Sequence, residues 1–300
     1  MRPAQRPAIA PGLVLAVAIV GISVAAPLVR LSAAPPAVIA LWRLGFSLVI
    51  VAAALGASGQ WRELITVRSR DLALSILAGV ALAGHFWSWN ASVHLTTIAA
   101  SVTLVSLQPA VVVLLSAFLL KETPTPRQLA GIAVALAGAL LISLPDVFRG
   151  AAASGATNPA LGNMLALLGA LLAAVYYVLG RGVRARLGVW SYVAIAYAAC
   201  FVALFLAAFV LRQPIWPQPR QELLIFAGLA LGPMLLGHTG MNWALRYRPA
   251  YVVNLTVLAE PFGASLIAAL LPWIAEVPPA TTIVGGVVVI TGMAMAAHRR

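Results

Sequence analysis

Long apolar segments alternate along the whole chain with short stretches that carry arginine, proline or acidic residues. A helix needs about 20 mostly apolar residues to cross the hydrocarbon core of a bilayer. Dividing the chain at its charged and proline-rich breaks predicts ten membrane-spanning helices, of which the fifth and the tenth are short. They are expected at residues 12–31, 36–55, 72–93, 98–120, 128–144, 160–180, 190–211, 223–245, 250–271 and 280–297.

The composition supports a membrane protein rather than a soluble one. Of the 300 residues, 62% are hydrophobic and 9% are charged, whereas a soluble domain carries about 25% charged residues. So few charged side chains cannot cover the surface of a water-soluble globule. We therefore expect an all-α polytopic membrane protein whose surroundings are the lipid bilayer. Cys200 is the only cysteine, so the chain cannot form an internal disulfide and has no cysteine pair at metal-ligand spacing.

The net charge of +12 is spread singly between the apolar segments. Nucleic-acid binding needs basic residues clustered on one face with aromatic side chains between them, so nucleic acid is excluded as a partner. Short cytoplasmic loops of membrane proteins are enriched in Lys and Arg. With ten helices, the loops on the side of the N-terminus carry fourteen of the 19 basic residues and the opposite loops carry four. We therefore expect a multi-pass protein of a bacterial inner membrane with both termini in the cytoplasm.

The second half of the chain repeats the first. The aligned pairs are Asn90 with Asn242 and Pro109 with Pro261, at an offset of 152, and Glu122 with Glu276, Gly131 with Gly285 and Gly138 with Gly292, at an offset of 154. This divides the chain into a five-helix repeat at 1–145, a connecting loop at 146–159 and a second repeat at 160–300. Because five is odd, the second repeat must enter the membrane from the opposite side. Inverted repeats of this kind are typical of secondary transporters that work by alternating access.

These features resemble the EamA family of the drug/metabolite transporter (DMT) superfamily. Each half has a proline midway along its fourth helix, then a glutamate in the next loop and a glycine-rich fifth helix. The stretches are Ser106-Leu107-Gln108-Pro109 with Lys121-Glu122 and Gly131, and Ala259-Glu260-Pro261 with Glu276 and Gly285. The resemblance implies a ten-helix basket in which helices one to four and six to nine surround a central cavity and helices five and ten lie outside. In layout, the YddG-type exporters of aromatic amino acids are the most similar members. The second half departs from the pattern at Pro272-Trp273, where the first half has Leu120-Lys121.

Glu260 is the one acidic residue placed well inside an expected span. A carboxylate at the bilayer centre costs about 2.5 to 3.5 kcal/mol on insertion scales, so it must face a cavity, find a partner or bind a proton. Pro261 removes a backbone hydrogen bond and kinks the helix at this depth. Gln108 and Pro109 occupy the equivalent positions in the first half, so we expect substrate contacts at Gln108 and Glu260 and helix kinks or gates at the two prolines.

Two readings of Glu260 remain open. It can form a structural ion pair with Arg43 or His238, the other ionisable groups well inside spans, or it can bind the ammonium group of a substrate. Arg43 suits a substrate carboxylate because its guanidinium is a planar fork, although helix packing explains it equally well.

Further candidate side chains come from the third and eighth helices and from aromatic residues. Helical spacing places His85, Ser88, Trp89 and Ser92 on one face of the third helix, and His238 with Asn242 on one face of the eighth. These groups suit the lining of a polar path. The aromatic side chains that could stack on a ligand are Trp42, Trp87, Trp89, Tyr176, Tyr177 and Tyr197.

The sequence argues against several other classes. It lacks the phosphate-binding loops of an ATP-driven pump and the His-Glu-x-x-His and Gly-x-Ser-x-Gly signatures of hydrolases, so we expect no cofactor, no metal and no catalytic residue. The expected function is export of amino acids, aromatic ones included, or of similar small metabolites. The main alternative is a broad-specificity exporter of drugs or other metabolites. A much weaker alternative is an intramembrane enzyme that uses Glu260 and His238 as acid and base. Ion coupling through Glu260 and facilitated diffusion both remain open.

Overall fold

The computed structural model describes residues 7–149, 157–263, 266 and 280–297. All regular structure in this part of the chain is helical, which confirms the all-α prediction for it. The elements are α1 (Pro11–Ser23), α2 (Ala25–Leu31), α3 (Pro36–Ala57), α4 (Trp61–Ile65), α5 (Ser69–Leu95), α6 (Ile98–Val105), α7 (Gln108–Leu115), η1 (Ser116–Leu120), α8 (Pro126–Arg149), α9 (Pro159–Arg184), α10 (Val189–Val210), α11 (Arg220–Leu229), η3 (Ala230–Thr239), α12 (Gly240–Ala244), α13 (Ala250–Asn254), η4 (Leu255–Ala259) and α15 (Ala280–Ala297). Pro272, Trp273 and Glu276 lie outside the described residues.

Seven helical segments of the described part are long and apolar enough to cross a membrane. They are Pro11–Leu31, Pro36–Ala57, Ser69–Leu95, Ala100–Leu120, Pro159–Arg184, Val189–Val210 and Arg220–Ala244. Two shorter apolar helices, Pro126–Ile142 and Ala280–Ala296, lie where the fifth and tenth spans were expected. The expected ninth span, 250–271, is described only up to residue 263 and at residue 266. Helix α8 continues through Pro145 to Arg149 rather than ending at residue 144.

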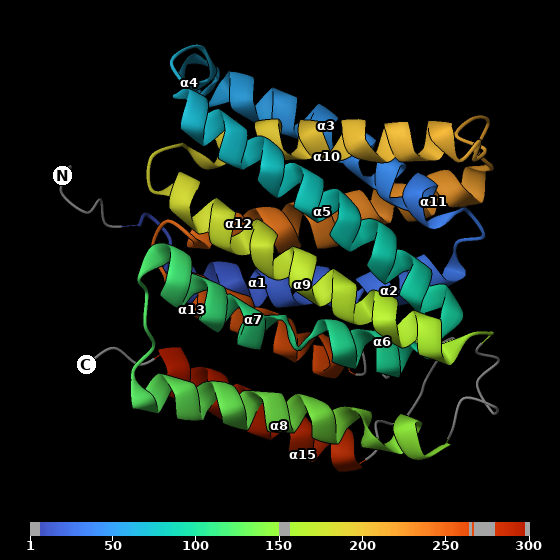
Figure 1. Cartoon of the computed structure of the whole chain (residues 1–300), viewed down its shortest axis with the longest axis vertical. Helices are drawn as coiled ribbons and strands as arrows, with labels where there is room; N and C mark the ends of the chain where they lie inside the picture. The colour runs from blue at the N-terminus through green and yellow to red at the C-terminus, as the bar shows by residue number, and fades with distance from the viewer. Residues whose placement is uncertain (1–6, 150–156, 264–265, 267–279, 298–300) are drawn as a thin grey trace.

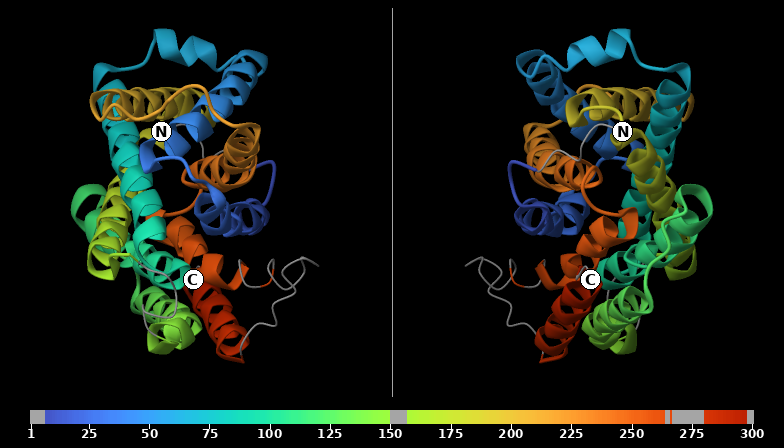
Figure 2. Two further views of the ribbon diagram at one scale, coloured as in Figure 1. Left: turned by 90° about the vertical axis from the view of Figure 1, so that its right-hand side faces the viewer. Right: turned by 90° about the vertical axis from the view of Figure 1, so that its left-hand side faces the viewer.

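The N-terminal and C-terminal parts of the chain interleave. Helix α10 packs against α3 and α5, α9 packs along α5, and α1 packs against η3. In Figure 1, α3 and α10 lie at one side of the molecule, and α8 and α15 lie together at the other. Figure 2 shows the α8–α15 pair at one end of the molecule, beyond the remaining helices. A cavity among the central helices therefore receives side chains from both parts of the chain.

Helices α8 and α15 meet backbone to backbone. A Cβ atom added at Gly131 would lie 2.7 Å from the carbonyl oxygen of Gly292, and one added at Gly138 would lie 2.8 Å from that of Gly285. At these distances only the hydrogen atom of a glycine fits between the two backbones. Since Gly131 faces the later glycine and Gly138 the earlier one, the two helices run antiparallel. Small residues at this spacing let helices approach closely without a hydrophobic driving force.

Among the described residues, four helical segments leave regular α-helix near their middle, each close to a proline. The prolines are Pro27, Pro109, Pro233 and Pro261. Helices α1 and α2 separate at Val24, and α6 and α7 separate at residues 106–107. The stretch η3 is a π-helix that contains Pro233, and η4 is a 3₁₀-helix that ends just before Glu260. Because proline has no N–H for the carbonyl four residues earlier, each segment must rearrange its hydrogen bonds there.

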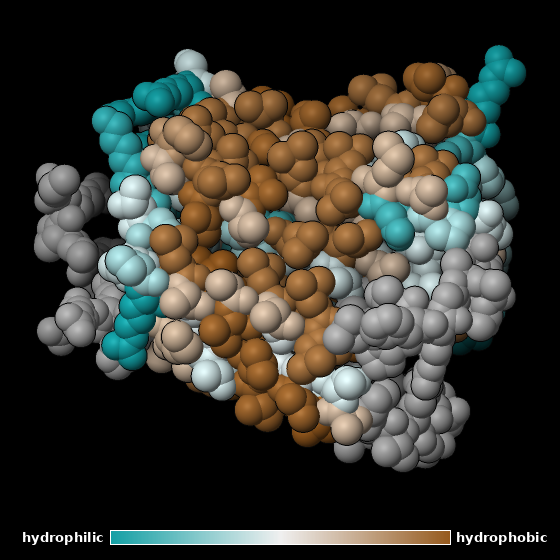
Figure 3. Space-filling model, turned by 60° about the horizontal axis from the view of Figure 1, so that its bottom comes forward, coloured by the Kyte–Doolittle hydropathy of each residue, from teal (hydrophilic) through white to brown (hydrophobic). Residues whose placement is uncertain are grey.

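The outer surface is suited to lipid. Figure 3 shows a broad hydrophobic face, with hydrophilic residues gathered towards both edges of the view. Large apolar side chains on several helices are well exposed, among them Phe118, Val210, Val49 and Phe209. In water such a surface would drive aggregation, whereas in a bilayer it contacts acyl chains.

Candidate functional site

A cavity lies among the broken helices. It is lined by Ile22, Ala25, Arg43, His85, Phe86, Trp89, Val105, Gln108, Tyr177, Pro233, His238, Met241, Val257 and Glu260. The wall is mainly apolar and aromatic, with a few polar groups that can orient what enters.

The irregular backbone brings the polar residues to this wall. Val105 and Val257 stand four residues before Pro109 and Pro261, so their carbonyls have no helical N–H donor at the usual position. Both valines line the cavity, and so do Gln108 and Glu260, which directly precede the two prolines. The repeat detected in the sequence thus corresponds to two matching interruptions that border one space.

Arg43 and Glu260 carry opposite charges into the cavity. The side chain of Arg43 is 2% exposed, and its guanidinium carbon lies 4.2 Å from the centre of the Phe86 ring, a cation–π contact. Neither its guanidinium nor the carboxylate of Glu260 has a hydrogen-bond or ion-pair partner among the described residues. The two charges are close enough to interact electrostatically. Both buried charges therefore remain available to a ligand.

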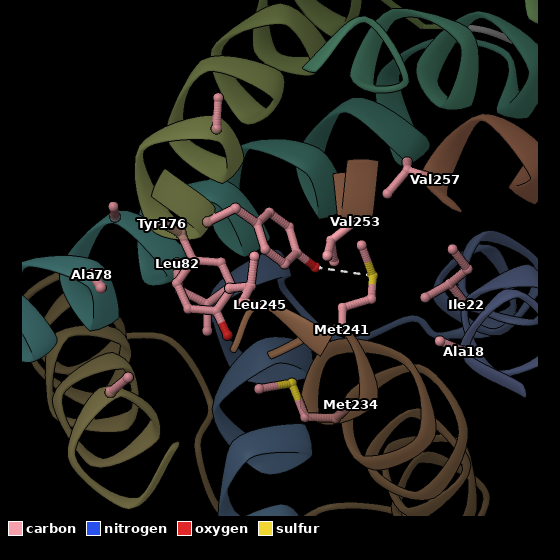
Figure 4. Close-up of a cluster of buried hydrophobic side chains, with 14 of the residues drawn as sticks. Ala18, Ile22, Ala78, Leu82, Tyr176, Met234, Met241, Leu245, Val253 and Val257 are labelled. Atoms are coloured by element: carbon pink, nitrogen blue, oxygen red, sulfur yellow. Dashed lines mark hydrogen bonds between the residues drawn. The ribbon is translucent and has the colours of Figure 1, made fainter. Parts of the chain in front are cut away.

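The two cavity histidines are held by fixed partners. Nδ1 of His85 lies 2.9 Å from the carbonyl oxygen of Gly169, which can only accept, so Nδ1 carries the proton in the neutral ring. The hydroxyl of Tyr177 lies 3.0 Å from Nδ1 of His238 and 3.3 Å from the sulfur of Met241. Figure 4 shows this bond to Met241 and the apolar wall around it, with Ile22 and Val257. Tyr177 thus ties α9 to the π-helical stretch across the cavity.

Seven of the nine expected substrate-contact residues line this one cavity: Arg43, His85, Trp89, Gln108, Tyr177, His238 and Glu260. Trp42 and Tyr176 do not. The indole N–H of Trp42 donates to the carbonyl of Ile215 at 3.0 Å, and the hydroxyl of Tyr176 accepts from the side chain of Asn242 at 2.5 Å. Pro109 and Pro261 stand beside lining residues without lining the cavity themselves.

Other expected contacts lie elsewhere. Trp87 points to the outer surface, and the hydroxyl of Tyr197 bonds to Thr239 at 2.9 Å. Ser88 donates to the carbonyl of His85 within α5 at 3.2 Å, and Ser92 donates to Ser101 of α6 at 2.7 Å, so both hydroxyls already have partners.

Sequence reasoning missed part of the cavity wall. Phe86 contacts both Arg43 and His238 with its ring, the centroids of Phe86 and His238 lying 5.2 Å apart. Pro233 and Met241 also line the space. Pro233 was detectable, because a proline inside an otherwise apolar span predicts a break in the helix.

Four carboxylates outside the cavity join the N-terminal part of the chain to the C-terminal part; we call them the bridging carboxylates. Glu63 accepts from the backbone N–H of Gly188, Asp71 pairs with Arg186, Glu122 pairs with Arg181, and Glu222 accepts from Ser32 and from the N–H of Ala33. Asp71 raises the pKa of Arg186 above its ordinary value through their hydrogen bond. These acidic residues were expected at helix ends and loops. Their bonds across the molecule were not foreseen.

Arg184 differs from the expectation based on loop charge. It was counted with Arg181 and Arg186 as a cytoplasmic loop residue, but it ends α9 and is 1% exposed. It donates from Nε to the carbonyl of Asn242 at 2.9 Å and from Nη1 to that of Leu187. Arg184 therefore satisfies a backbone carbonyl near the end of α12 from a buried position.

Comparisons with known proteins agree with this architecture. A probable terminal-alkyne amino-acid exporter of Streptantibioticus cattleyicolor is 29% identical over 268 residues, which are 87% of this chain and 84% of that protein. A solved crystal structure superposes with a TM-score of 0.76 at 21% identity, covering 96% of each chain, and so shares the fold. The EamA-like transporter family matches residues 9–144 and 160–297. The chain belongs to the EamA-like transporter family, a group of membrane transporters.

Proposed function

We propose that this transporter exports amino acids, aromatic ones included, or similar small metabolites across the bacterial inner membrane, with both termini in the cytoplasm. It would work by alternating access, as a secondary transporter built from ten helices in two inverted five-helix repeats. Family membership and the name of the relative from Streptantibioticus, a probable amino-acid exporter, support the class of substrate. The protein would transport its substrate unchanged and would not act as an enzyme.

The observation that carries the proposal is the pair of opposite, unpaired charges in one apolar cavity. Arg43 can bind a carboxylate through its planar fork, and Glu260 can bind an ammonium group. A free amino acid carries both groups on one carbon atom. Phe86, Trp89 and Tyr177 line the same cavity and can contact its side chain.

The antiparallel contact between α8 and α15 supports the inverted arrangement. The two helices belong to equivalent positions of the sequence repeat, and equivalent helices of inverted repeats run in opposite senses. Their glycines face each other in pairs, Gly131 with Gly292 and Gly138 with Gly285. The cavity bordered by Gln108 and Glu260 lies where a site shared by the two repeats would be expected.

The test is counterflow of labelled amino acids in proteoliposomes, across a range of pH, with Glu260→Gln beside the wild type. We expect counterflow of zwitterionic amino acids and a loss of about tenfold or more in the variant, because a hydrogen bond to a charged group contributes about 1.5 to 3 kcal/mol. Glu63→Gln removes a carboxylate outside the cavity and should retain transport. Loss of pH dependence alone in Glu260→Gln would make Glu260 a proton carrier rather than a substrate ligand.

Three outcomes would contradict the proposal. Wild-type counterflow that no amino acid supports, with inhibition by cationic amphipathic drugs instead, would favour a broad-specificity exporter. Unchanged transport in Glu260→Gln would remove Glu260 from the binding site. A chemically altered solute would indicate an enzyme.

A further inference from the structure

A second hollow, which we call the α2–α11 groove, lies on the outer surface. It is lined by Leu28, Leu31, Arg220, Gln221, Leu224 and Ile225. None of these residues lines the central cavity. Leu31 and Leu224 are 64% and 65% exposed, so the apolar floor of the groove is available to an external molecule.

The groove lies where the membrane surface is expected. Leu31 is the last residue of one membrane-length segment, and Arg220 is the first residue of another. An arginine at such a position keeps its guanidinium at the level of the lipid headgroups while its aliphatic part stays in the apolar region. The leucines on the same wall then face acyl chains.

The charge of Arg220 is not used inside the protein. Its side chain is exposed and has no hydrogen-bond or ion-pair partner among the described residues. The nearby carboxylate of Glu222 is buried and already accepts from Ser32 Oγ at 2.5 Å and from the N–H of Ala33 at 2.8 Å. An anion from outside is therefore the natural partner for Arg220.

We propose that the α2–α11 groove binds an anionic phospholipid, with its phosphate at Arg220 and one acyl chain along Leu28, Leu31 and Leu224. Charge complementarity and the adjoining apolar wall match the two parts of such a molecule. The lipid would touch α2 from the N-terminal part and α11 from the C-terminal part, which Glu222 already holds together. It would favour the arrangement in which these helices stay packed.

The test uses native mass spectrometry of the purified full chain with equal amounts of phosphatidylglycerol and phosphatidylcholine of the same chain length. The wild type should retain phosphatidylglycerol preferentially. Arg220→Gln should lower this preference about fivefold, since one arginine near an anionic lipid surface contributes about 1 kcal/mol. Arg212→Gln is the matched control, because Arg212 is an exposed arginine of the same loop outside the groove.

A second variant tests the apolar wall. Leu224→Trp fills the groove while leaving Arg220 in place, and it should reduce retention of phosphatidylglycerol although the charge is unchanged. Leu224 is exposed, so the variant should keep the size-exclusion profile of the wild type. Equal retention of the two lipids by the wild type, or equal losses in Arg220→Gln and Arg212→Gln, would overturn the proposal, and so would full retention in Leu224→Trp.

Discussion

The carboxylate of Glu122 lies 2.7 Å from a guanidinium nitrogen of Arg181, and it also accepts from the backbone N–H of Ala250 at 3.3 Å. Arg181 in turn donates to the carbonyl of Leu245 at 2.5 Å. One glutamate before α8 therefore holds α9 and the segment that leads into α13. Leu245 follows Met241, which lines the cavity, and bonds to its carbonyl. We therefore expect Glu122 to hold this side of the cavity closed.

We predict that Glu122→Gln opens the cavity more often on the side of Met241. The ion pair is partly exposed, so its loss should cost at most about 1 kcal/mol and raise the open population by up to about fivefold. The measurement is the rate at which a hydrophilic maleimide labels Met241→Cys, a cavity-lining position near Leu245, in a Cys200→Ser background. Glu222→Gln alters the contact between α11 and the residues after α2, and should not raise this rate. Equal acceleration by both changes would contradict the assignment.

The pair of Asp71 and Arg186 should respond unequally to loss of either member. The side chain of Asp71 is 5% exposed and that of Arg186 is 44% exposed. Arg186→Ala leaves a buried carboxylate without its cation, whereas Asp71→Asn leaves an arginine that water can solvate. We therefore expect the melting temperature to fall further in Arg186→Ala than in Asp71→Asn, as measured by intrinsic fluorescence in detergent.

The pH dependence of this pair follows from Arg186. The hydrogen bond to Asp71 raises the pKa of Arg186 above its ordinary value, so the contribution of the pair to stability is fully present below that ordinary value and disappears only as the pH rises through the folded-state pKa. The melting difference between Arg186→Ala and the wild type should therefore stay constant as pH rises from about 6 to 9. A steep change in this melting difference between about pH 6 and 9 would show that a group other than Arg186 controls it.

Arg43 should matter for transport and not for stability. Its guanidinium is buried without a hydrogen-bond acceptor among the described residues, which is costly for a charge. Arg43→Gln should lower amino-acid counterflow about tenfold or more while leaving the melting temperature unchanged or higher. A fall in melting temperature that parallels the loss of transport would instead indicate that Arg43 holds the helices together.

The close contact of α8 and α15 predicts a sharp difference between two glycines. Gly131→Ala forces a Cβ against the backbone of Gly292 and should destabilise the protein by about 1 to 3 kcal/mol. Gly56→Ala is the matched control, because a Cβ at this helical position meets nothing within 4 Å. Alanine there should raise stability by up to about 1 kcal/mol. Chemical denaturation of both variants gives the comparison, and similar effects would refute the packing argument.

Much of the candidate site could be predicted because few residue types belong at mid-membrane depth. Arg43, His85, His238 and Glu260 stand out as ionisable residues within apolar segments, and all four line the cavity. Such residues avoid lipid, so they turn towards whatever internal space exists. All-helical structure followed for a similar reason, since a backbone in lipid must satisfy its own hydrogen bonds.

The rest depends on rotation about helix axes and on contacts between distant segments. Tyr176 and Tyr177 are adjacent, so they point about 100° apart, and only Tyr177 lines the cavity. The same holds for Trp42 beside Arg43. Hydropathy cannot choose between such neighbours, and it cannot tell that Arg184, a residue at the end of an apolar segment, is covered by α12.

The glycine contact between α8 and α15 also limits which substitutions these helices can accept during evolution. When a bulky side chain appears on one helix of an ordinary pair, a smaller residue opposite can restore the fit. Here Gly292 already faces Gly131 with nothing left to remove. No substitution on the opposing helix can therefore make room for a larger side chain at either position. The two helices must keep their glycines or pack farther apart.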